Sequence, residues 1–281
     1  MDTSERPGIC RALVRGASLP YVAEGAGPTV ISVHGALADH RMWSRHSAHI
    51  AKQFHAVSYT QRYFGVDPWD RDWPPFGVGT HASDLVELIR ELQAGEVHLV
   101  AWSYAGHIAL TVALKHPDLI KSAFIYEPGA PTYLSDPADL EAFTADASAM
   151  FGPVFEAVQG AGDTLEGVRR LIDGSGQRSG YFDAQPEERR ALQLDNARTL
   201  PLLLAQSAPP VITCEDLRAL KVPVCVAYGE RTRPVFSVVS RAAARCIPGG
   251  WHRVIPGANH MWPDEDPAGF SAEVLDFLSK L

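Results

Sequence analysis

Short apolar runs alternate along the chain with longer segments in which apolar residues recur every three or four positions. The short runs are rich in β-branched side chains, the pattern of buried strands, and the longer segments have helical periodicity. Strands are predicted over 9–15, 19–24, 29–33, 55–59, 97–102, 120–126, 222–228 and 251–255. Helices are predicted over 41–53, 80–95, 104–115, 235–245 and 268–281. This alternation predicts an α/β fold with a mostly parallel eight-stranded sheet flanked by helices.

The strand pattern stops between residues 129 and 219. Helical segments separated by Gly, Pro and Ser replace it there, and strands return only after residue 220. The helical segments are predicted over 140–150, 155–159, 164–172 and 186–200. We therefore predict one core domain made of residues 1–128 and 220–281, interrupted by a helical cap insertion over 129–219.

A serine lies where the strand over 97–102 meets the helix over 104–115. A sharp turn at this place lifts the Ser103 hydroxyl clear of the sheet and sets it at the positive N-terminus of the helix. The small residues Ala101 and Ala105 flank the serine where glycines are more usual, and they leave room for strand and helix to approach closely. Ser103 is thus a candidate nucleophile, although a plain strand–helix connection stays open from this stretch alone.

A second turn with candidate chemistry follows the strand over 29–33, at His34-Gly35-Ala36-Leu37. A glycine directly after a buried strand lets the backbone turn sharply and expose an N–H group. The N–H of Ala36 is therefore a candidate donor to a developing oxyanion. His34 is interpreted as a structural loop histidine rather than a base.

Composition narrows the class of protein. The 281 residues are 46% hydrophobic and 21% charged, which is ordinary for a globular protein. A formal net charge of −8 argues against nucleic acids and anionic membrane surfaces as partners. No apolar run approaches the roughly 20 residues that span a bilayer, and residues 1–7 lack the apolar core of a secretory signal. A cytoplasmic location is predicted.

The four cysteines are Cys10, Cys214, Cys225 and Cys246. They are scattered along the chain without a C-x-x-C spacing. In a chain of this size we predict that they are reduced core thiols.

Three further histidines have spacings that allow chemistry. His46 and His49 lie three residues apart on one predicted helix, a spacing that can ligate a metal, but no cysteine or carboxylate nearby completes a site. We interpret them as part of a solvated helix face. His107 lies four residues after Ser103 and is a rival base, but a side chain at that spacing packs along the helix.

The long loop over 60–79 is rich in aromatic residues. Long aromatic loops in compact domains often cover a pocket or have a function. Here a loop pinned to the surface by its aromatic side chains is an equally good interpretation, and both stay open. The residues concerned are Tyr63, Phe64, Trp69, Trp73 and Phe76.

Taken in order, these features resemble the α/β-hydrolase fold superfamily over nearly the whole chain. The shared motifs are His34-Gly35 after the third strand, the Ser103 turn, the insertion after the sixth strand, and Gly257-Ala258-Asn259-His260 after the last. The resemblance implies a nucleophile, an acid and a histidine in that chain order. It makes Ser103 the nucleophile and His260 the base, with the N–H groups of Ala36 and Tyr104 as the oxyanion hole.

The acid departs from the usual pattern of the superfamily. In most members it follows the seventh strand in a Gly-Glu-x-Asp pattern, but this chain has Gly229-Glu230-Arg231-Thr232, and threonine carries no charge. Some members take the acid from the end of the preceding strand, where this chain has Glu127. Glu127 is therefore the preferred acid, Glu230 is the alternative, and a site without a carboxylate is the third option.

The resemblance implies a serine hydrolase that cleaves a carboxylic ester or lactone through an acyl-enzyme on Ser103. Trp102 and Leu37 are candidates for substrate contact, and the aromatic complement, with Trp69, Trp73 and Trp262, favours a hydrophobic small molecule. No metal or organic cofactor is implied. Carbon–carbon bond hydrolysis, cofactor-free oxygenation, acyl transfer and a binding protein without turnover stay open as alternatives. A homodimer is neither required nor excluded.

Overall fold

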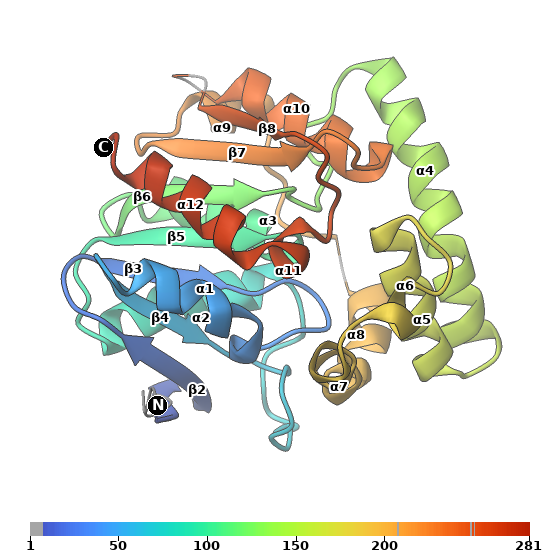
Figure 1. Cartoon of the computed structure of the whole chain (residues 1–281), viewed down its shortest axis with the longest axis horizontal. Helices are drawn as coiled ribbons and strands as arrows, with labels where there is room; N and C mark the ends of the chain where they lie inside the picture. The colour runs from blue at the N-terminus through green and yellow to red at the C-terminus, as the bar shows by residue number, and fades with distance from the viewer. Residues whose placement is uncertain (1–7, 207, 248, 250) are drawn as a thin grey trace.

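A computed structural model describes residues 8–281 except 207, 248 and 250 (Figure 1). Residues 1–7, on which the absence of a secretory signal was judged, lie outside this part. The apolar runs form one eight-stranded sheet in the order β1-β2-β4-β3-β5-β6-β7-β8. Its strands are β1 (Cys10–Val14), β2 (Ala17–Glu24), β3 (Thr29–Val33), β4 (His55–Tyr59), β5 (Val97–Trp102), β6 (Ile120–Tyr126), β7 (Val224–Gly229) and β8 (His252–Ile255).

Pairing within the sheet confirms the predicted α/β fold. Only β2 runs antiparallel to its neighbours, β1 and β4, and all other described pairs are parallel. Parallel strands bring their carboxyl ends to one edge of the sheet, and that edge is where ligands bind in such folds. The turns after β3, β5 and β6 therefore meet at one edge.

Helices cover both faces of this sheet, as Figure 1 shows. On one face the buried residues of α2 (Val78–Glu91), α3 (Tyr104–Lys115) and α10 (Pro234–Cys246) form a core with the strands. On the other face α1 (Ser44–Ile50) and α12 (Pro267–Leu278) do so. The burial of Leu85, Leu88 and Ile89 on α2 follows the helical spacing that predicted the helix.

A group of helices between β6 and β7, called here the inserted helices, lies beyond the arrowhead of β7 in Figure 1. Part of the cavity described below is formed by these helices. They are α4 (Pro137–Phe155), α5 (Thr164–Gly176), α6 (Tyr181–Ala184), α7 (Glu187–Asp195) and α8 (Leu200–Ala205). Within the described residues no helix is both long and apolar enough to cross a membrane.

Two helix boundaries in this group differ from the prediction. The break expected near Gly152-Pro153 is absent, because α4 continues through Pro153 to Phe155 and runs into a π-helical turn, Glu156–Gly160. The single helix expected over 186–200 is instead interrupted at Asn196, whose buried side chain bonds to other segments. At Asn196 tertiary contacts override local helix propensity.

The aromatic loop packs against itself and the core. The Tyr63 ring contacts Trp69, Trp73 and Phe76, and its hydroxyl donates to the carbonyl of Pro74 at 2.6 Å. Phe64 and Phe76 are buried. Of the two interpretations of this loop, the structure favours the pinned one.

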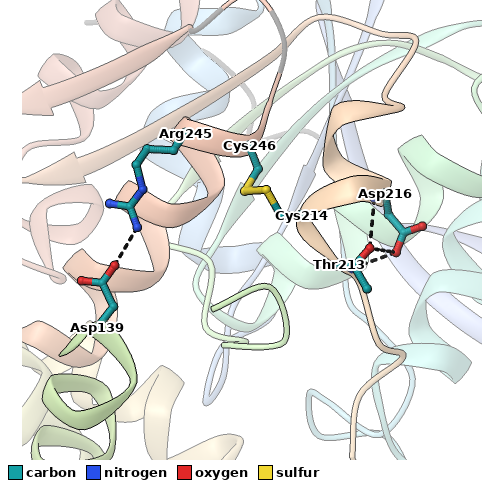
Figure 2. The surroundings of a disulfide bond; sticks show 6 residues. All are labelled: Asp139, Thr213, Cys214, Asp216, Arg245 and Cys246. Atoms are coloured by element: carbon teal, nitrogen blue, oxygen red, sulfur yellow. Dashed lines mark hydrogen bonds and ion pairs between the residues drawn. A yellow bond between two sulfur atoms is a disulfide. The ribbon is translucent and has the colours of Figure 1, made fainter. Parts of the chain in front are cut away.

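The prediction of four reduced core thiols is wrong for two of the cysteines. Cys214 and Cys246 form a disulfide that joins α9 (Cys214–Arg218) to the last residue of α10 (Figure 2). Although 32 positions separate the two residues in sequence, the packing of α9 on α10 brings their Cα atoms within 5.2 Å. Cys10 is exposed, and Cys225 alone fits the predicted buried thiol.

Polar contacts hold both helices that the disulfide joins, as Figure 2 shows. Arg245, next to Cys246, pairs with Asp139 of α4 at 2.6 Å. Thr213 and Asp216 form a capping box at the start of α9. The end of α10 is thus tied both to α9 and to the inserted helices.

Candidate active site

Ser103 lies at the apex of the predicted turn. Its backbone, with φ 61° and ψ −121°, connects β5 directly to α3. This strained conformation aims a side chain away from the sheet. The close approach of α3 to the loop after β6 requires glycine at 106, because a Cβ there would lie 2.8 Å from the Cα of Pro128. The alanines at 101 and 105 are fully buried, so the turn forms without the two usual glycines.

The structure brings Ser103, His260 and Glu127 together from three separate segments. The Ser103 hydroxyl lies 3.0 Å from Nε2 of His260, and Nδ1 of His260 lies 2.6 Å from Oε2 of Glu127. Glu127 is fully buried and His260 is 4% exposed. With Nδ1–H donating to the carboxylate, Nε2 is free to accept the serine proton. This is the arrangement that activates a serine as a nucleophile.

Glu127 accepts two further hydrogen bonds from the end of β7 and the segment that follows it. The Gly229 N–H donates to Oε1 at 2.8 Å, and the Thr232 hydroxyl donates to Oε2 at 2.9 Å. Glu230, the alternative acid, accepts the N–H of Gly257 at 2.8 Å and is exposed. Among the described residues, the carboxylate that contacts His260 is that of Glu127.

Two aromatic residues hold the histidine in place. The ring of Phe236, on α10, stacks on the imidazole of His260 with a centroid distance of 3.5 Å and an interplanar angle of 2°. The Tyr126 hydroxyl donates to the carbonyl of Asn259 at 2.6 Å and fixes the loop that bears the histidine. Sequence reasoning missed Phe236, because one apolar residue on an amphipathic helix gives no signal of such a contact.

The loop after β3 approaches the Ser103 turn closely. A Cβ on Gly35 would lie 3.1 Å from the carbonyl oxygen of Trp102 and 3.3 Å from the Cβ of Ser103, so only glycine fits without displacing its neighbours. His34 is buried and shapes this loop: Nδ1–H donates to the Gly35 carbonyl, and Nε2 accepts the N–H of Gln61. Burial lowers the pKa of His34 to about 4, so it is neutral, as expected of a structural histidine.

The two expected oxyanion donors, Ala36 and Tyr104, both line the same cavity as Ser103. The Ser103 side chain does not cap α3, so the N-terminal N–H groups of this helix have no partner from that side chain. The Tyr104 ring is fixed because its hydroxyl donates to Nδ1 of His81 at 2.8 Å, while Nε2–H of His81 donates to the Arg62 carbonyl. Burial lowers the pKa of His81 to about 3 and keeps it neutral.

A cavity of about 660 Å³ opens above Ser103. The lining is mostly apolar and includes both residues predicted to contact substrate, Trp102 and Leu37. Of the other tryptophans named from the sequence, Trp262 packs against Tyr126 and does not line the cavity, and neither do the loop residues Trp69 and Trp73. The hydrophobic character of the cavity therefore comes mainly from aliphatic and phenylalanine side chains of the core and the inserted helices.

Two other histidines singled out from the sequence, His107 and His46, have structural partners. His107 lines the cavity, but its Nε2–H donates to the Pro210 carbonyl at 2.6 Å rather than facing the serine. The interpretation of His46 as part of a solvated face is wrong. It is fully buried, its Nε2–H donates to the Pro263 carbonyl, and its ring packs edge-on against Trp43 and Phe270.

The sequence of this chain matches a known protein family and is similar to known proteins. The model of the alpha/beta hydrolase family matches residues 30–273. The chain is similar to the 2-(acetamidomethylene)succinate hydrolase of Mesorhizobium japonicum, with 28% identity over 272 residues that cover 91% of this chain and 89% of the relative.

Solved structures share the fold. An esterase from Rhodococcus, RhEst1, superposes with a TM-score of 0.78 at 23% identity, covering 97% of this chain and 99% of the esterase. The enol-lactonase of Burkholderia xenovorans superposes with a TM-score of 0.71 at 19% identity, covering 96% of this chain and all of the lactonase. At these identities the likeness concerns the fold alone.

Proposed function

This chain belongs to the alpha/beta hydrolase family, and we propose that it is a serine hydrolase that cleaves a carboxylic ester or lactone of a hydrophobic small molecule. The observation that supports this most is the unbroken series of contacts from the Ser103 hydroxyl through His260 to Glu127. It lies at the base of a mostly apolar cavity. A carboxylesterase among its relatives supports the same class of reaction.

In the proposed reaction Ser103 attacks the ester carbonyl, and His260 takes the hydroxyl proton at Nε2. The imidazolium that forms is stabilised by the carboxylate of Glu127 on Nδ1. The backbone N–H groups of Ala36 and Tyr104 stabilise the oxyanion of the tetrahedral intermediate. His260 then protonates the leaving alcohol, and an acyl group remains on the Ser103 oxygen.

The second half of the reaction uses the same residues. Water enters the site, His260 removes a proton from it at Nε2, and the resulting hydroxide attacks the acyl carbon. The bond between the acyl carbon and the Ser103 oxygen then breaks, the Ser103 oxygen takes the proton back from His260, and the carboxylic acid product leaves. The inserted helices act as a cap in this proposal, because they form part of the wall of the cavity and limit access of bulk water.

The proposal is tested by hydrolysis of p-nitrophenyl acyl esters by the wild type and by Ser103→Ala, Glu127→Gln and Glu230→Gln. Ser103→Ala is expected to abolish turnover. Glu127→Gln is expected to lower kcat by roughly two to four orders of magnitude, because the histidine loses its charged partner. Glu230→Gln is the matched control and is expected to stay within about threefold of the wild type, since the exposed Glu230 carboxylate accepts the Gly257 N–H and, among the described residues, makes no hydrogen bond to His260.

Folding of each variant is checked by circular dichroism and thermal unfolding. Full activity in Glu127→Gln would remove Glu127 from the mechanism. A wild type that binds esters but does not turn them over would instead identify a hydrolase-like binding protein.

A further inference from the structure

One end of the cavity differs from the rest, because it contains an ion pair. Among the described lining residues, Arg189 and Asp264 are the only Arg, Lys, Asp or Glu. Nη2 of Arg189 lies 2.6 Å from Oδ1 of Asp264, and the two side chains are 11% and 9% exposed. The pair is thus largely shielded from bulk water and borders a mostly apolar space.

The pair lies between the two segments that hold the proposed machinery. Arg189 is on α7, one of the inserted helices, and its Nη2 also donates to the carbonyl of Met42 at 3.3 Å. Met42 follows closely on the loop that contains Ala36. Asp264 is four residues after His260, in the short helix α11 (Trp262–Glu265). A group bound to this pair would therefore belong to the same substrate molecule that reaches Ser103.

Both partners have polar atoms without a protein partner. A guanidinium has five N–H donors, and those on Nε and Nη1 of Arg189 make no hydrogen bond to a described residue. Oδ2 of Asp264 accepts no hydrogen bond from the residues that the structure describes, and Oδ1, although it lies 2.6 Å from Nη2 of Arg189, is buried without a well-directed hydrogen bond. The pair therefore leaves unused donors and an unused acceptor at the cavity wall.

A purely structural role explains this pair poorly. Taking two charges out of water carries a large desolvation cost for each ion, and apolar side chains of similar volume are often at least as stabilising as a buried pair. The unused donors and acceptor add to this cost unless a ligand satisfies them. Their position on the cavity wall indicates that a polar part of the substrate does so.

The charges of Arg189 and Asp264 determine which kind of substrate group can bind to them. Nη2 of Arg189 lies 2.6 Å from the Asp264 carboxyl, so the guanidinium charge faces the group that can balance it. Burial raises the pKa of this carboxyl, and the Arg189 guanidinium opposes that rise. The two charges cancel, and a free carboxylate on the substrate would bring an uncompensated charge into an apolar cavity. A neutral group that both accepts and donates a hydrogen bond fits both unused partners. A secondary amide is such a group.

We propose that Arg189 and Asp264 form an amide-binding subsite, and that the substrate is an ester or lactone whose acyl part contains a secondary amide. The amide carbonyl accepts from the free N–H groups of Arg189, and the amide N–H donates to Oδ2 of Asp264. The substrate class rests on the proposed ester or lactone hydrolysis, whereas the binding preference does not.

The test compares p-nitrophenyl esters of equal chain length. The amide esters are those of N-acetyl-β-alanine, N-acetyl-γ-aminobutyrate and N-acetyl-δ-aminovalerate, which move the amide along the acyl chain. The alkyl esters are the hexanoate, heptanoate and octanoate, and the mono-ester of adipate supplies a carboxylate. For each protein variant the ratio of kcat/KM for the amide ester to that for its alkyl partner is measured.

The variant Arg189→Met/Asp264→Leu removes both charges together, so that neither is left buried alone. At the amide position that fits best, the double variant is expected to lower the amide-to-alkyl ratio at least about tenfold, the effect of losing one or two hydrogen bonds to charged groups. The matched control is Arg169→Met/Asp183→Leu, which removes an exposed ion pair of the inserted helices away from the cavity. It is expected to keep the wild-type ratio.

The same preference is measured without turnover, by calorimetric titration of the esters into Ser103→Ala with and without the double substitution. If the wild type hydrolyses none of the esters, the proposed function fails, and the titration alone decides on the subsite. An amide-to-alkyl ratio that is the same with and without the pair overturns the inference. So does a preference for the adipate mono-ester that disappears with the pair, because it would make this an anion site.

Discussion

Thr232 occupies the position after β7 at which the resemblance leads one to expect the acid. Its hydroxyl donates to the same oxygen of Glu127 that contacts His260, at 2.9 Å. The side chain at position 232 thus contacts Glu127, the residue that pairs with His260, although threonine itself carries no charge. A threonine here holds the carboxylate that approaches from the end of β6.

This geometry predicts that the acid can be moved back to position 232. Glu127→Gln removes the charge, and adding Thr232→Asp places a carboxylate within reach of Nδ1 of His260. We expect the double variant to recover at least about tenfold of the kcat lost in Glu127→Gln, because the imidazolium regains a charged partner. Steady-state hydrolysis of a p-nitrophenyl ester measures this.

The matched control is Glu127→Gln/Thr232→Asn, which has the same shape at position 232 without the charge. It is expected to show no recovery. Equal rates in the Asp and Asn versions would mean that position 232 cannot supply the acid.

At the scale of elements, Asn196 connects the inserted helices to the core. Its Oδ1 accepts the N–H of Gly65 at 2.6 Å, and its Nδ2 donates to Asp39 and to the Leu192 carbonyl, both at 2.9 Å. The residue is fully buried, so each of these bonds is made away from water. It joins the segment between α7 and α8 to the loops after β3 and β4.

Asn196→Ala is therefore expected to lower the free energy of unfolding by about 2–3 kcal/mol, because buried partners lose their hydrogen bonds. Urea denaturation measures the change. Hydrogen exchange is expected to rise around Gly65, whose amide loses its acceptor. Ser279→Ala, which removes one exposed bond to the Asp276 carbonyl, is the control and is expected to change stability by less than about 0.5 kcal/mol. An unchanged stability in Asn196→Ala would show that these bonds do not fasten the inserted helices.

The sequence predicts elements well where local pattern and burial agree. All eight strands were predicted, because runs such as 29–33 and 97–102 are mostly apolar and are buried at every position. The interruption at Asn196 was not predictable, since it arises from contacts with residues more than a hundred positions away. The disulfide was missed for the same reason, because only the packing of α9 on α10 brings its cysteines together.

The residues of the candidate site likewise fall into some that the sequence identified and some that it did not. Ser103, His260 and Glu127 were identified from their places after strands, which a parallel sheet brings to one edge. Phe236, Arg189 and Asp264 come from helices, where a side chain that faces a cavity has the same local pattern as one that faces the core. Their positions depend on how the inserted helices dock.

At the scale of the whole molecule, buried neutral histidines make stability depend on pH. Burial lowers the pKa of His34 to about 4 and that of His46 and His81 to about 3, from an unfolded value of 6.5. Below about pH 6.5 the unfolded chain takes up protons that the folded chain does not bind. The free energy of unfolding therefore falls as the pH falls through this range.

The expected decrease between pH 6.5 and pH 4 is about 1 kcal/mol per pH unit for each of the three histidines. Chemical denaturation at a series of pH values measures it. The variant His46→Gln keeps a donor for the Pro263 carbonyl. Its free energy of unfolding is expected to decrease less steeply with pH, because the contribution of one histidine is removed. A stability that does not change between pH 7 and pH 5 would contradict this assignment of neutral histidines.

The bond between Cys214 and Cys246 closes a covalent ring that contains α9, β7 and α10, and its sequence separation of 32 sets how much freedom it removes from the unfolded chain. By loop-closure entropy that restriction is worth about 3–4 kcal/mol. The surrounding redox potential decides whether the ring is closed. The protein is therefore more stable with this disulfide formed than with both cysteines reduced. The redox conditions of the compartment that the protein occupies determine which form is present.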